Sequence, residues 1–172
     1  AELDEARLEE VVGLAVRMLD DVIDISGYPL PRQEDEARAK RRIGLGITGL
    51  ADALLYCGLA YGSPAAVERM EAWLIAIRRA AYRTSALLAA EKGPFPCYDP
   101  VMLDRPGLLA LDDETRGMIA AHGLRNGCLT SIAPTGTTSL LAGNVSSGIE
   151  PVFAYQYNRR ILQPDGSVRY ES

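Results

Sequence analysis

The residues best suited to chemistry in this sequence lie in one stretch, from Cys128 to Gly143 (CLTSIAPTGTTSLLAG). It reads as a β-prone run over residues 128–133, a turn rich in hydroxyl groups, and a helix beginning near Leu140. Gly136 in the turn has no Cβ, so the backbone there can adopt positive φ and come close to a ligand. The first N–H groups of a helix lack intrahelical partners and attract anions. The pattern therefore indicates a phosphate-binding turn.

The same pattern also fits a plain strand–turn–helix joint in which a Thr or Ser serves only as an N-cap, and from the pattern alone this is the commoner case. A P-loop would require Gly-Lys followed by Ser or Thr at the end of the turn. No lysine occurs between residues 128 and 143, which argues against a nucleoside triphosphatase. Any phosphate in this turn would be bound by backbone N–H groups, hydroxyl groups and the helix terminus.

The composition is that of a single globular core. The chain has 172 residues, of which 48% are hydrophobic and 24% are charged. A net charge of −5 argues against a dedicated nucleic-acid or membrane-surface binder. No stretch approaches the roughly 20 consecutive apolar residues of a membrane-spanning helix, and the N-terminus has no signal-peptide character. We therefore expect a cytoplasmic protein that contacts neither nucleic acid nor membrane.

The two ends of the chain lead us to expect a piece of a longer protein, with residues 1–172 forming a single partial domain. The first residue is Ala1 rather than an initiator Met, and the last residues follow closely on a hairpin-like turn. We expect the segment to act together with other parts of that protein.

Other residues capable of chemistry are weaker candidates. Cys57, Cys97 and Cys128 have neither metal-binding nor disulfide spacing. No basic neighbour is placed to lower the pKa of the Cys97 thiol. His122, the single histidine, adjoins a predicted helix end, where a capping or surface role is expected.

Three aspartates, Asp20, Asp21 and Asp24, gather at the end of the first predicted helix, where the helix dipole disfavours negative charge. Asp20 and Asp24 share a helix face and would suit a carboxylate metal site. No histidine or further carboxylate run supports such a site, so no metal ligand is assigned. Pairing with the cationic residues between Arg38 and Arg42 is the favoured interpretation.

Hydrophobic periodicity and turn residues outline the elements that would position these groups. Helices are predicted over residues 2–24, from Ser63 as N-cap and Pro64 as first helical residue, and from Asp112 or Asp113 to Ala121. The buried stripe expected for the long middle helix is Val67, Met70, Leu74, Ile77, Ala81, Thr84 and Leu88. Strands are predicted over residues 153–162 and 168–170, joined by a turn at residues 164–167.

Residues 32–42 read as a charged connector, and residues 43–58 as a helix with Gly58 as its C-cap. Gly44, Gly46 and Gly49 have the spacing of a dinucleotide-binding fingerprint. That fingerprint needs a strand before it and an acidic residue at the end of a second strand, and neither is predicted here. We expect the glycines instead to let a helix pack closely against its neighbours.

The sequence resembles the large, catalytic chain of ribonucleotide reductases, most closely its adenosylcobalamin-dependent (class II) branch. The blocks that carry the resemblance follow the family's order over nearly the whole segment. They are Leu19–Asp24 (LDDVID), Tyr28–Pro31 (YPLP), Arg41–Leu54 (RRIGLGITGLADAL), Glu91–Pro96 (EKGPFP), Arg125-Asn126, Ile132–Thr137 (IAPTGT) and Ser146–Phe153 (SSGIEPVF). The turn APTGT together with SSGIEP favours the cobalamin branch over the di-iron branch.

The resemblance implies an α/β fold, in which this segment is a helix-rich fragment of the ten-stranded reductase barrel with two or three short strands. In the family, the loop that matches the central turn binds the phosphates of the substrate through backbone amides and hydroxyls at a helix start. The substrate-binding residues implied here are Pro134, Thr135, Gly136, Thr137, Thr138 and Ser139. Thr138 stands where class II members often have Ile, a departure that leaves the amides intact.

For the parent enzyme the resemblance implies reduction of ribonucleoside di- or triphosphates to 2′-deoxyribonucleotides. Adenosylcobalamin would generate a thiyl radical, and a dithiol such as thioredoxin would be the external reductant. The family's radical-bearing cysteine lies in an Asn-x-Cys-x-Glu motif, whereas residues 126–130 (NGCLT) have Thr in place of Glu. No catalytic role therefore falls to Cys57, Cys97 or Cys128. The segment alone, without the remainder of its chain, is expected to bind no cofactor and to be inactive.

Two alternatives remain open at this point. A di-iron (class I) reductase would share the phosphate loop but would need a partner protein to generate its radical. A non-catalytic helical interaction module would have kept the scaffold without binding a nucleotide.

Overall fold

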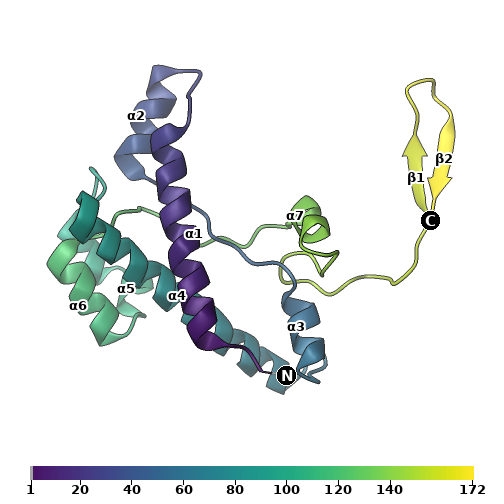
Figure 1. Ribbon diagram of the computed structural model, residues 1–172, viewed down its shortest axis with the longest axis horizontal. Helices are drawn as coiled ribbons and strands as arrows, with labels where there is room; N and C mark the ends of the chain where they lie inside the picture. The colour runs from purple at the N-terminus through teal and green to yellow at the C-terminus, as the bar shows by residue number, and fades with distance from the viewer. Residues whose placement is uncertain (1) are drawn as a thin grey trace.

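The computed structural model describes residues 2–172, which form a helix-rich body and a separate β-hairpin (Figure 1). The elements in chain order are α1 (Glu5–Ile25), α2 (Pro31–Lys40), α3 (Leu50–Tyr56), α4 (Pro64–Lys92), the 3-10 helix η1 (Pro100–Asp104), α5 (Pro106–Leu109), α6 (Asp113–His122), α7 (Gly136–Leu141), β1 (Arg159–Leu162) and β2 (Val168–Glu171). Strands β1 and β2 pair antiparallel, with Arg159 opposite Glu171 and Leu162 opposite Val168, which confirms the predicted hairpin. Residues 153–158, predicted as part of the first strand, are irregular. None of the helices described is both long and apolar enough to cross a membrane.

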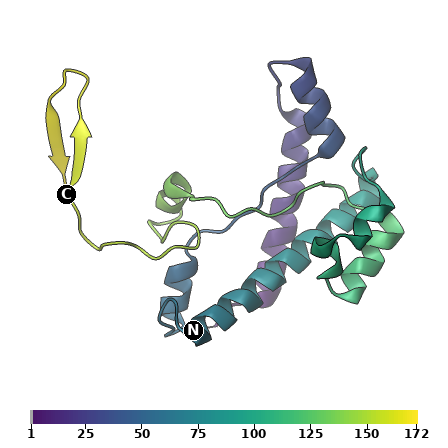
Figure 2. The same cartoon turned by 180° about the vertical axis from the view of Figure 1, so that it is seen from behind.

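Helix α4 is the element around which the body packs. It begins as predicted, with Pro64 in the first turn and the Ser63 hydroxyl accepting a hydrogen bond from the N–H of Ala66 at 3.2 Å. Helix α1 crosses α4, and α6 lies against its C-terminal half (Figures 1 and 2). Helix α6 also matches its prediction, because the Asp112 carboxylate caps it by accepting from the N–H of Thr115 at 2.9 Å.

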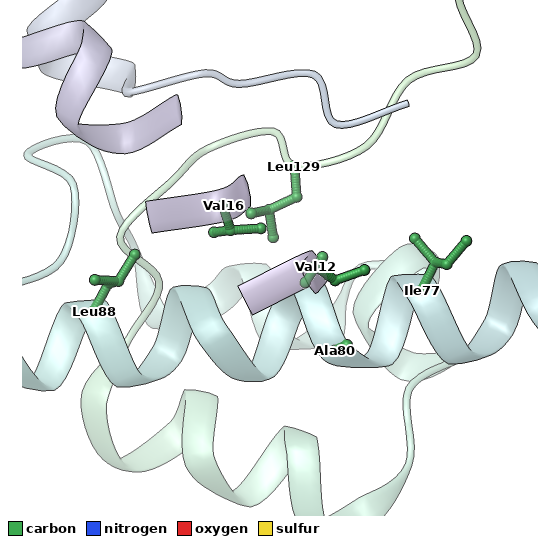
Figure 3. Close-up of a cluster of buried hydrophobic side chains, with 7 residues drawn as sticks. Val12, Val16, Ile77, Ala80, Leu88 and Leu129 are labelled. Atoms are coloured by element: carbon green, nitrogen blue, oxygen red, sulfur yellow. The ribbon is translucent and has the colours of Figure 1, made fainter. Parts of the chain in front are cut away.

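The main hydrophobic core lies between α1 and α4 and includes one residue from outside the helices (Figure 3). Leu129, from the segment that leads to the central turn, is only 2% exposed and packs into this core. Its burial fixes that segment onto the helix pair. The buried members are Val12, Val16, Ile77, Ala80, Ala81, Leu88 and Leu129.

The stripe predicted for α4 is only partly correct. Ile77, Ala81 and Leu88 are buried, but the side chain of Val67 is 50% exposed. Ala66 and Trp73 are buried instead, because α3 packs its own leucines against them in a second core. The sequence pattern of α4 alone could not show which side α3 would cover.

Residues 32–42 are not a connector, and that prediction is wrong: most of them form α2. Pro31 lies in the first turn, where a missing N–H costs nothing. Ion pairs one turn apart, Glu34 with Arg38 and Glu36 with Lys40, support an otherwise polar helix.

The segment before α3 is extended, so the helix predicted over residues 43–58 is wrong in its first half. The N–H of Leu45 donates to the carbonyl of Leu129 at 2.8 Å, and the N–H of Ser131 donates to the carbonyl of Leu45 at 2.9 Å. A Cβ on Gly46 would lie 3.0 Å from the carbonyl oxygen of Ser131. The glycine therefore allows two extended segments to approach each other, rather than a helix to pack.

Several boundaries also differ from the predictions, including the start of α1, which is Glu5 rather than residue 2. The β-prone run over residues 128–133 forms one parallel bridge, between Leu45 and Thr130, instead of a longer strand. The helix expected from Leu140 begins at Gly136, because the chain turns directly into it. Helix α3 is capped by Cys57, and Gly58 follows with φ of +73°.

A buried ion cluster ties the two extended segments to α1, and it confirms the predicted pairing of the aspartates with arginines. Asp20 is fully buried and accepts hydrogen bonds from Arg41 at 2.9 Å, from Arg125 at 3.2 Å and from Asn126 at 2.9 Å. Arg41 also donates to Asp24 at 2.7 Å, and this hydrogen bond holds the pKa of the Asp24 carboxyl below its ordinary value. The cluster thus fixes the chain at residues 41 and 125–126, just before each extended segment.

We predict that Asp20→Ala will be strongly destabilising. Arg41, Arg125 and Asn126 would all lose the buried carboxylate to which they donate, and breaking a buried ion pair by removing one member costs about 3–5 kcal/mol of unfolding free energy. Urea unfolding of the wild type and the variant measures the loss. Glu10→Ala, which removes an exposed ion pair with Arg7, is the control and should change stability by less than about 0.5 kcal/mol. Equal effects of the two substitutions would contradict the assignment.

Candidate functional site

The central turn enters α7 through a residue with an uncommon backbone conformation. Thr135, the N-cap of α7, has φ of 51° and ψ of 29°, in the left-handed region that a β-branched residue rarely adopts. Such a conformation costs of order 1–3 kcal/mol and persists only where the surroundings impose it. The strain therefore marks this turn as one whose shape is held by neighbouring groups.

The first backbone amides of α7 are available to a ligand. Among residues 2–172, no acceptor receives a hydrogen bond from the N–H of Gly136, Thr137 or Thr138, and all three residues are exposed. The N–H of Ser139, the next residue, is already bonded to the carbonyl of Thr135 at 2.8 Å. A Cβ built on Gly136 would have no atom within 4 Å, so the space over the turn is open. Three adjacent donors at a helix start suit a phosphate group.

The hydroxyl groups of the turn divide into two kinds. The Thr135 hydroxyl accepts from the N–H of Gly148 at 2.6 Å and donates to the Thr48 hydroxyl at 3.2 Å. The buried Ser139 hydroxyl donates to the carbonyl of Gly136 at 3.0 Å. These two hydroxyls therefore fasten the turn, whereas those of the exposed Thr137 and Thr138 have no partner among the described residues. Pro134 is exposed and, as a proline, offers no N–H.

The segment after α7 packs against the central turn. Gly148 has φ of +53°, and a Cβ on it would lie 2.8 Å from the carbonyl oxygen of Ala133. The hydroxyl of Ser147 lies 3.2 Å from that of Ser139. The motif SSG at residues 146–148 is thus packed directly against the candidate site.

A groove in the described part of the chain adjoins the turn without including it. It has a volume of about 660 Å³ and lies between α3, α4 and the extended segments. Ile132 precedes the turn and Ile149 follows it, and both line the groove, but none of residues 134–139 does. The amides of Gly136, Thr137 and Thr138 therefore face an open surface beside an apolar groove.

The remaining candidates do not form a second site. The carboxylates of Asp20, Asp21 and Asp24 come close enough for a metal, but they face Arg41, Arg125 and Lys92 instead. All three cysteines are free thiols, and none lies within a helix or strand of the described residues. His122 is exposed in the last turn of α6, away from the central turn.

Sequence reasoning missed the residues that hold the turn in place. These residues are Thr48, Asp52, Ser146 and Gly148. They form hydrogen bonds across more than eighty positions of sequence or lie in loops, so no periodic pattern marks them. All four lie in blocks that carry the family resemblance, residues 41–54 and 146–153, but the resemblance gave them no role in holding the turn.

Comparison with known protein families gives a match over residues 1–170 to the family model described as "Ribonucleotide reductase, barrel domain". A vitamin B12-dependent ribonucleoside-diphosphate reductase of Mycobacterium tuberculosis is 44% identical over 160 residues, which cover 93% of this chain and 20% of that protein. A protein of the same description from Thermoplasma acidophilum is 37% identical over 160 residues, covering 93% and 19% respectively.

A relative whose name carries no mention of vitamin B12 is also similar. The ribonucleoside-diphosphate reductase subunit alpha of Chlamydia muridarum is 36% identical over 190 residues, covering 96% of this chain and 18% of that protein. This chain thus spans about a fifth of the length of these relatives.

We predict that Gly148→Ala will destabilise the protein more than Gly58→Ala. Both positions have positive φ, where a Cβ costs about 1–2 kcal/mol. Gly58 has open space around its Cβ position, whereas at Gly148 the new methyl would meet the backbone of Ala133. The backbone must shift, which adds about 1 kcal/mol or more. Urea unfolding compares the two variants, and equal losses would show that the contact under the turn is not tight.

Proposed function

This chain belongs to the ribonucleotide reductase barrel-domain family, and on that premise we propose that it forms part of a reductase barrel and binds the phosphates of the nucleotide substrate at residues 134–139. The observation that carries this proposal is the row of unpaired, solvent-facing amides at Gly136, Thr137 and Thr138. Because no cation lies in the turn, binding would depend on these dipoles and on the hydroxyls of Thr137 and Thr138. Such a site holds an anion in place and leaves the reaction to other groups.

The pairing of the two extended segments supports the role as barrel wall. The bridge between Leu45 and Thr130 is parallel, the arrangement expected where helices connect neighbouring strands of an α/β barrel. Helices α1 and α4 cover one side of this pair through Leu129. We propose that the pair belongs to the ten-stranded reductase barrel, whose other strands are contributed by the remainder of the protein.

The names of the relatives support the reaction that we propose for the whole protein. Each of the three describes a ribonucleoside-diphosphate reductase. We infer reduction of a ribonucleoside diphosphate to its 2′-deoxy form, with a dithiol such as thioredoxin as reductant and a cytoplasmic location. The relative at 44% identity is named as dependent on vitamin B12, whereas the name of the relative at 36% identity does not mention the vitamin. The higher identity favours adenosylcobalamin over a di-iron partner as the source of the radical.

Adenosylcobalamin would supply the initiating radical in the whole enzyme, but the residues of this segment do not fit it. The groove beside the turn, about 660 Å³ in volume, is lined chiefly by aliphatic side chains. A corrin carries many amide groups that need polar partners, and this groove offers few. We therefore assign the cofactor to other parts of the protein and derive no step through it.

We predict that Thr137→Pro will weaken phosphate binding more than Thr137→Ala. Proline is tolerated in the first turn of a helix but removes one amide donor. Alanine keeps the amide and removes only the hydroxyl. A hydrogen bond to a charged group contributes about 1.5–3 kcal/mol, equivalent to roughly a 10- to 100-fold change in Kd. NMR titration with ADP, following the Gly136 and Thr138 amides, measures both variants.

Adenosine, which lacks phosphate, is the ligand control in that titration and should leave the Gly136 and Thr138 amides unmoved. If ADP shifts other amides but not these, the proposed phosphate site is wrong. If Thr137→Ala weakens binding as much as Thr137→Pro, the hydroxyl rather than the amide binds the phosphate.

We also predict that the 172-residue chain alone produces no deoxynucleotide when given ADP, adenosylcobalamin and a dithiol. The family's Asn-x-Cys-x-Glu motif is absent from the chain, with Thr130 in place of Glu. The amount of deoxyadenosine diphosphate formed is measured by chromatography. Product formation by the purified chain would mean that one of its own cysteines carries the radical.

A further inference from the structure

Every polar group of Ser146 is bonded to the start of α3. Its N–H donates to the carboxylate of Asp52 at 2.8 Å, and its hydroxyl accepts from the N–H of Asp52 at 3.3 Å. Its carbonyl accepts from the N–H of Gly49 at 2.7 Å and from the hydroxyl of Thr48 at 2.9 Å. Ser146 is only 1% exposed, so these bonds are sheltered from water.

This arrangement is a capping box divided between two distant segments. In an ordinary capping box, the N-cap Ser bonds the amide of the third helical residue, and the side chain of that residue bonds the N-cap amide. Here the N-cap of α3 is Gly49, which has no side chain, and Asp52 is the third helical residue. Ser146 supplies the missing hydroxyl and the reciprocal amide across 94 positions of sequence. We call this pair of bonds the split capping box.

The split capping box connects directly to the candidate site. Ser147 and Gly148 follow Ser146 in the chain and contact the hydroxyls of Ser139 and Thr135. Thr48, one residue before the N-cap of α3, also bonds the Thr135 hydroxyl. Two hydrogen bonds to the Thr135 hydroxyl, one from Gly148 and one to Thr48, therefore stabilise its left-handed conformation. Both partners are positioned by residues at or beside the N-terminus of α3.

We propose that Asp52 is a positioning residue for the phosphate-binding turn. Its carboxylate fixes Ser146, Ser146 places Ser147 and Gly148 under the turn, and these place Thr135 so that the amides of Gly136–Thr138 point in one direction. Among the described residues, Asp52 forms no hydrogen bond with residues 134–139. It therefore acts on the turn only through Ser146 and is not itself a ligand. This inference rests on the proposed function, because it assigns a cause to the shape of that site.

The test measures the affinity of inorganic pyrophosphate for the 172-residue chain by NMR, using the amides of Gly136 and Thr138. We expect Asp52→Ala to raise Kd at least fivefold and to move these amide signals in the free protein. Asp52→Asn should restore wild-type affinity, since its amide oxygen can still accept from the N–H of Ser146. The milder Ser146→Ala variant, expected to weaken binding in the same direction, decides the matter if Asp52→Ala does not fold.

Asp112→Ala is the matched control, because Asp112 caps α6 by accepting from the N–H of Thr115 and lies outside the network around the turn. It should destabilise the fold without changing the affinity for pyrophosphate. Equal weakening by Asp52→Ala and Asp112→Ala would show a general loss of stability and overturn the inference. Unchanged affinity in both Asp52→Ala and Ser146→Ala would also overturn it while leaving the proposed function standing. A wild-type protein that does not bind pyrophosphate at these amides would end both proposals.

Discussion

The structure depends on a carboxylate that is sealed from water and paired with cations. Asp20 is charged, fully buried and bonded to Arg41 and Arg125, which begin the two extended segments. A buried charge is tolerable only when it is paired and hydrogen-bonded, so these residues must come together for α1 to pack. These ion pairs fix the position at which each extended segment begins. From there, the parallel bridge between Leu45 and Thr130 carries both segments toward the candidate site.

The other end of the paired segments is fixed by the split capping box between Ser146 and Asp52. Between these two anchors the chain passes through Thr135, whose left-handed conformation is kept by hydroxyl and amide partners. The consequence is a turn in which the hydroxyls of Thr135 and Ser139 are bonded internally, while the amides of Gly136–Thr138 are exposed and have no acceptor among residues 2–172. Uncharged donors fixed in this way would be preorganised for the phosphate that we propose as their ligand.

Much of the fold could be predicted from local signals. Ser63 with Pro64, and Asp112 before α6, mark helix starts because a cap and its helix are adjacent in sequence. Helix α2 was missed because its stability comes from charge pairs rather than from an apolar stripe. The extended segment before α3 was missed because its partner, near Leu129, is far along the chain. Sequence periodicity contains no information on such a pairing.

The candidate site shows the same limit. Gly136 and the hydroxyls around it could be read as an anion site from their types and order alone. Which of these hydroxyls form internal hydrogen bonds could not be predicted. The partners of Thr135 and Ser139 are Gly148 and Ser147, which the fold brings back to the turn. Asp52 could be read only as one more residue of a helix. Its partner, Ser146, is brought to it by the fold.

The most direct measurement of the central claim is a crystal structure of this chain with a nucleoside diphosphate bound. We expect phosphate oxygens at about 2.7–3.2 Å from the backbone nitrogens of Gly136, Thr137 and Thr138, with Thr135 still left-handed. A diphosphate bound instead to surface arginines, with those nitrogens facing only solvent, would contradict it.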